Sequence, residues 1–333
     1  ASDCKALLTC QLIAMRILKR NNIELKDSLI LASCADEEHG GRYGFGWMAE
    51  HHPEKLAAPY AVNEGGGVPI EAAGNLTYLL GIGEKGRLQL EIEVRGSSAH
   101  ASTPWQGNNA LCGLSEVVRR IEAYEAERDT STSLFDHLST FAIEDKPSPE
   151  NIDQIIADNE ESQPRFASIM KALSRMTITP TMIQGGIKYN SVPESVKLNC
   201  DDRTLPHQDE AYVRQELANI LDGIPGVEID IDYMSIPNAS PFETEFAQRI
   251  QISTANALNR DDIQWVPSLS PGFTDSRFTR NLGTTTYGMV GSHPDDDPMI
   301  SFIHGTNESV GIKSLVSGTK IMLGLAYDML AAK

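Results

Sequence analysis

The sequence predicts an α/β protein, with a mostly parallel sheet flanked by helices, into which a smaller α+β domain is inserted. Helices and short apolar strands alternate at both ends of the chain, as they do in sheets covered by helices. Between these ends, strands of alternating apolar and polar residues indicate a sheet with one exposed face. At 333 residues, the chain is long enough for two domains.

The α/β domain is expected to draw its elements from both ends of the chain. Residues 5–20 are apolar on all sides and basic in the last turn, which predicts a mostly buried helix. SLILAS, residues 28–33, is an apolar run that predicts a fully buried parallel strand. A helix over residues 42–52 and a buried strand in YAVNEGGG, residues 60–67, follow. After Pro241 the alternation of helices and strands resumes, and the last predicted element is an apolar helix that begins at about residue 314.

Acidic residues follow both predicted strands. Asp36, Glu37 and Glu38 come soon after the first strand, and Glu64 ends the second. Adjacent acids repel one another and are costly to desolvate, so an arbitrary acidic triplet is most often a solvated loop. Sites in α/β sheets, however, gather at the carboxyl ends of strands. The shared placement of the triplet and Glu64 therefore favours a cation site.

The middle of the chain predicts a second domain. RLQLEIEVRG, residues 87–96, alternates with period two, and it is followed by a helix, two strands, a second helix and a last strand. This order, βαββαβ, is that of a ferredoxin-like domain. A polar and helical insertion interrupts it at about residues 129–176, where prolines mark a loop. The expected boundaries are 1–86 and 238–333 for the α/β domain and 87–237 for the inserted domain.

Composition and charge exclude several classes of partner. Hydrophobic residues make up 41% and charged residues 22%, as in ordinary globular proteins. The net charge of −18 argues against nucleic acid, which needs a basic face, and against an anionic membrane surface. The sequence has no apolar run long enough to span a membrane. Five scattered cysteines without a CxxC pair predict a reducing, cytoplasmic compartment.

Oxygen and imidazole side chains stand where a hydrolytic metal site would need them. Such a site requires rigidly held ligands, an open position for water and a carboxylate that takes the water's proton. The candidates are Asp3 before the first helix, Glu37, Glu38 and Glu64 at strand ends, and His304 at the end of a late apolar run. Taken singly, each of these residues is more often a solvated or satisfied side chain.

Motifs along the chain resemble those of one enzyme family. In order, these motifs are ASDCKA, ADEEHGG, NEGGG, SSAHASTPWQGNNA, GGIKYNSVPESVKLNCDDR, PGFTDSR and HGTNE. Their order and approximate spacing resemble the cocatalytic-zinc family of glutamate carboxypeptidase, aminoacylase, acetylornithine deacetylase and succinyl-diaminopimelate desuccinylase. The resemblance covers almost the whole chain. It implies a zinc-peptidase-like catalytic α/β domain with an inserted lid that makes a homodimer.

The resemblance implies roles for residues of the α/β domain. Asp3 is similar to the carboxylate that bridges two zinc ions, and Glu38 and His304 are similar to further ligands of one of them. Glu64 corresponds to the acid ligand of the other zinc. Glu37 matches the general base, which deprotonates the bridging water and later protonates the leaving amine. Cobalt or manganese can replace zinc at such sites.

Residues of the lid and of a late loop resemble the substrate-binding groups of that family. His100 is similar to the histidine that polarises the scissile carbonyl and stabilises its oxyanion, often from the partner subunit. Asn190 and Arg203 resemble residues that hold substrate oxygens, and arginine suits a two-pronged grip on a carboxylate. Gly272 and Thr274 lie in the loop that lines the substrate pocket of relatives.

The sequence departs from the family pattern at its beginning. In the family, a strand with an HxD motif precedes the ASD segment, and its histidine binds the second zinc. This strand is absent from the sequence, in which Asp3 is the third residue. We therefore expect the zinc held by Asp3, Glu38 and His304 to keep its ligands, and the zinc shared by Asp3 and Glu64 to lack its imidazole.

Two functions of different classes follow. The first is a zinc-dependent metallopeptidase or amidohydrolase that cleaves the amide bond of a small N-acyl amino acid or a short peptide with a free carboxylate. The sequence does not separate carboxypeptidase, dipeptidase and N-acyl amino acid deacylase, although NEGGG and PGFTDSRF are more typical of the carboxypeptidase-like and aminoacylase-like members. The second is a catalytically impaired family member or fragment that acts as a dimeric binding protein. The absent HxD strand favours the second function, and the joint presence of Glu37, Glu38, His100 and His304 favours the first.

Overall fold

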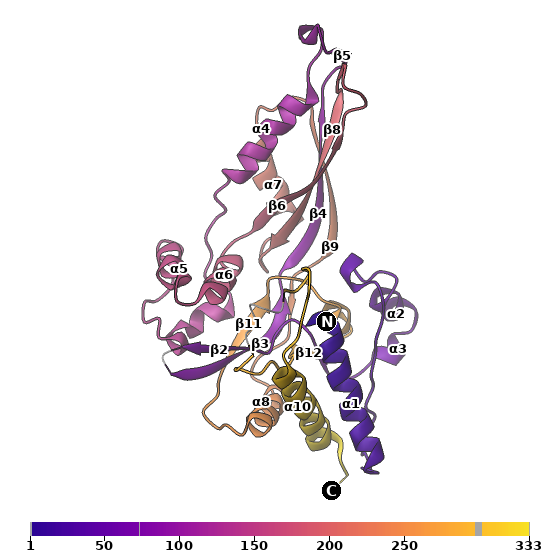
Figure 1. The fold of residues 1–333 in the computed structure, drawn as a ribbon, viewed down its shortest axis with the longest axis vertical. Coiled ribbons are helices and arrows are strands. Elements are labelled where there is room, and N and C mark those ends of the chain that lie inside the picture. The colour runs from indigo at the N-terminus through magenta and orange to yellow at the C-terminus, as the bar shows by residue number, and fades with distance from the viewer. Residues whose placement is uncertain (1, 73, 297–301, 333) are drawn as a thin grey trace. The chain divides into compact units, whose positions relative to one another are not determined.

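The computed structural model describes residues 2–72, 74–296 and 302–332, and it separates into two compact units. Unit 1 comprises Ala1–Glu84, Thr130–Met170 and Asn238–Lys333. Unit 2 comprises Lys85–Asp129 and Lys171–Pro237. The chain therefore leaves unit 1 and returns to it twice, which agrees with an α/β domain that is discontinuous in sequence (Figure 1).

Unit 1 contains a mixed sheet rather than the mostly parallel sheet that the sequence predicted. Its parallel pairs are β1 (Tyr60–Asn63) with β12 (Thr285–Gly288) and β11 (Gln264–Ser270) with β3 (Asn75–Glu84). Two further strands run antiparallel to β3, namely β2 (Val68–Ala72) and β10 (Asn238–Ala239). β2 and β3 are close in sequence, and a short connection can join only antiparallel neighbours. The α/β class is confirmed.

Three helices of unit 1 lie side by side, with α10 (Ile312–Leu330) between α1 (Leu7–Arg20) and α8 (Glu245–Leu258) (Figure 1). The helix predicted near the start of the chain therefore forms, but it buries one stripe rather than all sides. The buried residues are Leu7, Cys10, Ala14 and Leu18, whereas Leu12 is 44% exposed. The remaining helices of the unit are α2 (Phe45–His51), α3 (Pro53–Leu56), α5 (Ile152–Glu160), α9 (Ser276–Asn281) and most of α6 (Pro164–Leu173).

The predicted strand SLILAS is wrong. Residues 28–33 are not in a strand, and no strand of the described chain pairs with them. Ile30 is 51% exposed. An apolar run becomes a buried strand only where another element covers it, and the described residues supply no such cover here. The next predicted strand does form, as β1, and Glu64 directly follows its carboxyl end.

The segment expected as an insertion of the lid packs with unit 1 over residues 130–170. A 3₁₀ helix, Ser133–Phe141, contacts β11 and β3. Its apolar side is buried, and the buried residues are Leu134, Phe135, Leu138 and Phe141. These side chains explain why a segment that is inserted in the sequence of the lid belongs to the core of the α/β unit.

Unit 2 has the ferredoxin-like topology that the sequence predicted. Its antiparallel sheet has the order β6 (Thr177–Gly185), β8 (Ser195–Thr204), β4 (Gly86–Arg95) and β9 (Val227–Ser235). The helices α4 (Ala110–Glu122) and α7 (Glu210–Leu221) complete the core of this sheet. A short pair, β5 (Ala99–His100) with β7 (Ser191–Val192), extends from the same unit.

Alternation along β4 explains the core of unit 2. Leu88, Leu90, Ile92 and Val94 are each at most 1% exposed, while the residues between them are more exposed. The residue that precedes each of the helices α4 and α7 accepts, with its side chain, a hydrogen bond from a backbone N–H of the first turn. This bond stabilises the N-terminus of the helix. In α4 this residue is Asn109, and in α7 it is Asp209.

Candidate metal centre

Asp3, Glu38 and His304 come together in unit 1, as the predicted set for one zinc ion requires. His304 Nε2 lies 2.8 Å from Asp3 Oδ2 and 3.3 Å from Glu38 Oε1. One ligand atom from each residue lies within 4.8 Å of the other two. Carboxylate oxygens and an imidazole nitrogen are ligands that zinc accepts, and His304 is exposed enough to leave a position open.

The HGTNE motif supplies both the imidazole and a side chain that hydrogen-bonds the backbone of Asp3. His304 adopts a left-handed backbone conformation, with φ of 60°. Four residues later, Glu308 Oε1 accepts a hydrogen bond of 2.7 Å from the backbone N–H of Asp3. The motif therefore ties two segments that are about 300 residues apart in sequence. This role of Glu308, the last residue of the HGTNE motif, becomes visible only in the structure.

Glu37 and Glu38 lie in a tight turn, here called the acidic loop (residues 36–41). Three backbone hydrogen bonds close this loop, from the N–H of His39 to Asp36 O at 3.1 Å, from Gly40 to Glu37 O at 2.9 Å and from Gly41 to Asp36 O at 2.7 Å. Asp36 Oδ2 also accepts from the N–H of Tyr43 at 2.9 Å. Asp36 thus supports the loop rather than only facing solvent.

The pKa of the Glu37 carboxyl is raised to about 7, mainly by burial and also by the neighbouring Asp275, Glu38 and Asp3. The guanidinium of Arg277 acts in the opposite direction. A carboxyl group whose pKa lies close to neutrality can both take and give a proton at physiological pH. This is the property that a general base of a hydrolase needs.

Glu64 completes a crowded group of acids. Burial raises the pKa of its carboxyl, and Glu37 and Asp3 add to the rise, Asp3 also through a side-chain hydrogen bond. A cation that binds between such closely spaced acids offsets their mutual repulsion and stabilises the arrangement. The donor set therefore fits a metal ion, since Asp3 contacts both Glu64 and His304, and His304 also contacts Glu38. Among the described residues, the Asp3, Glu38 and His304 group is the one set of three that meets ligand spacing.

The loop containing Gly272 and Thr274 is held by a buried acid. Thr274 is 4% exposed, and its N–H and Oγ1 donate to Glu84 at 3.0 and 2.5 Å. Arg280 pairs with the same carboxylate at 3.1 Å. The N–H of Gly272 donates to Ser270 Oγ at 3.2 Å. The Thr274 hydroxyl is thus engaged within the protein, and the sequence analysis did not identify Glu84 or Arg280 as the groups that hold it.

The predicted substrate residues of unit 2 do not form one cluster. His100 is exposed on β5, with Nδ1 2.7 Å from Ser102 Oγ, and the Asn190 carbonyl accepts from Ala101 at 3.1 Å, so these two lie close together. Arg203 grips Asp201 with two hydrogen bonds of 2.5 and 3.1 Å near the far end of β8. At roughly 3.3 Å per residue, the strand places Arg203 about 26 Å from the β7 end of β8.

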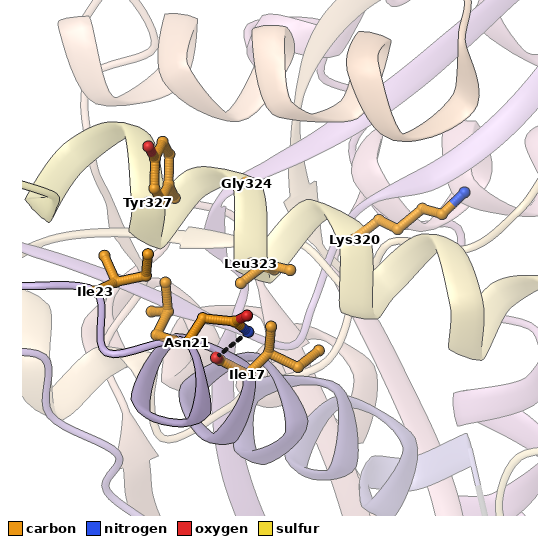
Figure 2. A pocket seen from close by; sticks show the side chains of 8 residues that line it. Ile17, Asn21, Ile23, Lys320, Leu323, Gly324 and Tyr327 are labelled. Carbon is orange, nitrogen blue, oxygen red and sulfur yellow. Dashed lines mark hydrogen bonds between the residues drawn. The ribbon is translucent and has the colours of Figure 1, made fainter.

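A separate apolar cavity of about 330 Å³ lies between the C-terminal halves of α1 and α10 (Figure 2). Ile17, Leu18, Ile23 and Leu323 line it, together with Asn21, whose Nδ2 donates to Ile17 O at 2.8 Å. None of the clustered acids lines this cavity, and Asp3 precedes the opposite end of α1. It is therefore not part of the candidate metal centre.

Comparisons with known proteins agree with the geometry. Residues 82–226 match the peptidase dimerisation domain family. The chain is 23% identical to carboxypeptidase S of Saccharomyces cerevisiae, over 95% of this chain and 62% of that protein. It is 22% identical to the human N-fatty-acyl-amino acid synthase/hydrolase PM20D1, over 98% of this chain and 66% of that protein. The chain thus spans about two thirds or less of the length of these relatives.

Solved structures show the same fold. An M20 family metallo-carboxypeptidase of Sulfolobus solfataricus, Sso-CP2, superimposes with a TM-score of 0.64 at 17% identity, over 97% of this chain and 75% of that chain. Human carnosine dipeptidase 1 gives a TM-score of 0.63 at 13% identity, over 99% of this chain and 72% of that chain.

An α/β unit with a carboxylate–imidazole cluster and an inserted antiparallel domain defines the class of metallopeptidase-like two-domain proteins. Within this class, the chain is similar to the M20 peptidases, because residues 82–226 match the peptidase dimerisation domain and the fold matches that of an M20 metallo-carboxypeptidase. The resemblance found in the sequence is thereby confirmed. No helix in the described part of the chain has the length and apolarity needed to cross a bilayer.

Proposed function

We propose that the protein is a metal-dependent hydrolase that cleaves the amide bond of a small N-acyl amino acid or short peptide with a free carboxylate. The observation that carries the proposal is the meeting of Asp3, Glu38 and His304, with the raised pKa of Glu37 beside them. The curated relatives support it, since they are a carboxypeptidase, an N-fatty-acyl-amino acid hydrolase and probable desuccinylases. The reducing compartment indicated by the cysteines stays a prediction.

Three residues would hold the first metal ion, namely Asp3, Glu38 and His304, and Asp3 with Glu64 would face a second. Zinc bound there would supply Lewis acidity, which makes water more acidic and polarises a substrate carbonyl. Glu37 accepts the proton of the attacking water and then donates it to the leaving amine. Burial favours both transfers, because it makes the Glu37 carboxyl less acidic than a free one and so able to return the proton it has accepted.

The lid supplies the groups that address the substrate. His100 donates a hydrogen bond to the oxyanion of the scissile carbonyl. The planar guanidinium of Arg203, which Asp201 orients, binds the substrate carboxylate. Arg203 lies about 26 Å along β8 from the end that follows β7, and His100 pairs with Ser191 of β7, so a small substrate cannot touch both residues of one lid. We therefore assign His100 to the site of the partner subunit.

The free edge of β6 is the surface that we assign to the homodimer. In the described chain β6 pairs on one side with β8 and has no strand on the other. Met182 and Ile183 on this strand are 55% and 59% exposed. An unprotected edge strand with apolar side chains readily adds a strand from another chain. The match of this unit to a peptidase dimerisation domain supports the same assignment.

A dimeric binding protein without turnover is the second candidate. The observation that favours it is that, among the described residues, Asp3, Glu38 and His304 form the one set of three with ligand spacing, and Glu64 does not belong to this set.

A matched pair of neighbouring variants tests the proposed function. Glu37→Gln removes the proton acceptor, so kcat should fall by about 10²–10⁴ while bound zinc is retained. Glu38→Gln removes a ligand, so zinc should be lost as well. Zinc content by plasma mass spectrometry and turnover of a panel of N-acyl amino acids and dipeptides are the measurements. A wild-type dimer that binds zinc but cleaves nothing in the panel would favour the second candidate.

A further inference from the structure

Arg277 is a buried cation beside the acidic loop, and the proposed function gives it no role. Its side chain is 4% exposed, although arginine is rarely buried to this extent without specific partners. Nη1 donates to the Thr274 carbonyl at 3.2 Å, and Nη2 donates to the carbonyl of Gly40, within the acidic loop. One guanidinium therefore joins the acidic loop to the loop that contains Thr274.

Aromatic rings fix the plane of this guanidinium. Its central carbon lies 4.5 Å from the centre of the Phe273 ring and 4.4 Å from that of the Phe278 ring. Contact with two rings restricts the rotational freedom that a long side chain would otherwise keep. The two donor groups are thus aimed at their carbonyls before any ligand arrives.

The same segment also packs directly on the glycines of the acidic loop. A Cβ atom built at Gly41 would lie 2.3 Å from Asp275 Oδ1 and 3.0 Å from the Phe278 ring. Gly41 also has a φ of +61°, which other residues rarely adopt. The backbone conformation of Gly41 and its contact with the Phe278 ring therefore favour glycine here and place the acidic loop directly against helix α9.

We propose that Arg277 is a positioning residue, which holds the acidic loop so that Glu37 and Glu38 face the metal centre. This inference rests on the proposed function for its catalytic consequence. Its charge also opposes the mutual repulsion of the acids, since Arg277 is the cation that offsets both Glu37 and Asp275. Groups behind metal ligands commonly determine affinity by orienting the ligands, and their loss costs on the order of 10–100-fold in metal affinity.

Arg280 provides a matched control for Arg277. It lies in the same helix, α9, and its side chain is 6% exposed. It bonds Glu84, Asn238 and the Thr286 carbonyl, and none of its hydrogen bonds reaches the acidic loop. Truncation of either arginine should therefore lower the free energy of unfolding, whereas only truncation of Arg277 should change the metal centre.

The test compares Arg277→Ala with Arg280→Ala by zinc competition against a chromogenic chelator and by amide hydrogen exchange of residues 36–41. Arg277→Ala should weaken zinc binding by about 10–100-fold and speed exchange of the loop. Added ethylguanidinium should restore both properties, and sodium chloride at equal ionic strength should not. Arg280→Ala should bind zinc as the wild type does. If Arg277→Ala does not fold, Arg277→Lys keeps the charge without the two-pronged reach, and it should show the same losses to a smaller degree.

Unchanged zinc affinity and unchanged loop exchange in Arg277→Ala or Arg277→Lys would overturn the inference. So would equal losses in Arg277→Ala and Arg280→Ala. Failure of the proposed function would look different, because the wild type itself would then bind no zinc or cleave no amide. In that case hydrogen exchange without metal still decides whether Arg277 holds the loop.

Discussion

Glu37 lies among carboxyl groups from separate parts of unit 1. Asp3 comes from the segment before α1, Glu38 is the residue next to Glu37 in the sequence, and Asp275 precedes α9. Without a cation, Glu37 keeps a proton that a free carboxyl group would release, and burial likewise raises the pKa of Asp275 to about 6. Folding therefore builds a binding site whose metal-free state costs free energy at neutral pH.

This cost predicts how stability depends on pH. Above 4.5, the ordinary pKa of a glutamate, the unfolded chain releases the Glu37 proton, whereas the folded chain keeps it up to about 7. The metal-free folded state therefore loses stability as pH rises through this window. Glu37→Gln should remove part of that loss and stabilise the chain above pH 7 by on the order of 1 kcal/mol, after screening by water.

Urea denaturation in the presence of a chelator measures this effect at pH values below 4.5 and above 7. The suitable control is Glu50→Gln, which makes the same chemical change at an exposed acid on α2. A wild type whose stability changes no more with pH than that of Glu37→Gln would refute the linkage.

The sequence predicted the candidate ligands better than their supports. Asp3, Glu38 and His304 carry chemistry that a motif reveals, and the structure brings them together. Arg277, by contrast, donates a hydrogen bond to the backbone carbonyl of Gly40. Every residue has such a carbonyl, so the sequence alone does not indicate which one an arginine will contact. Thr274 shows the same limit, since its hydroxyl bonds the distant Glu84.

At the scale of elements, a local pattern predicted the structure correctly where the rest of the same unit supplies the packing. Alternation in β4 predicts its buried face because the strand pairs on both sides within its own unit. SLILAS failed because its apolar residues describe what the segment could bury, not whether a partner is present. The 3₁₀ helix Ser133–Phe141 likewise packs on β11, more than a hundred residues later in the chain.

The free edge of β6 predicts the effect of one surface charge. Ile183→Lys places a charge on an exposed edge position, where charged side chains oppose pairing with another strand. We expect the dimer dissociation constant to rise at least tenfold, which corresponds to about 1.4 kcal/mol. Analytical ultracentrifugation measures it.

Ile252→Lys on α8 is the matched control, because Ile252 is 51% exposed and lies in unit 1. Its dimer should be as stable as that of the wild type. A wild-type chain that sediments as a monomer, or an Ile183→Lys dimer of unchanged affinity, would place the interface elsewhere.

At the scale of the whole molecule, the candidate metal ligands all belong to unit 1. A ligand stabilises only the folded unit that binds it, by about 2.7 kcal/mol when its concentration is one hundred times the dissociation constant. Zinc should therefore raise the unfolding temperature of unit 1 and leave that of unit 2 unchanged. The two transitions should separate in calorimetry as zinc replaces the chelator.

His304→Ala should abolish this shift, whereas His39→Ala should preserve it, since His39 is an exposed histidine of the acidic loop outside the ligand cluster. A shift of both transitions by the same amount would mean that the two units unfold as one cooperative body.

The closeness of Asp3 and His304 also constrains synthesis. The two residues are 301 positions apart, and unit 2 is encoded between them. At roughly 5–20 residues per second, a ribosome needs about 15–60 s to travel from one to the other. The lid can complete its own fold during that interval, in which Asp3 and Glu38 have been synthesised and His304 has not. In the proposed function, the complete ligand set can therefore bind a metal only late in translation, and a cation bound earlier would be held by carboxylates alone.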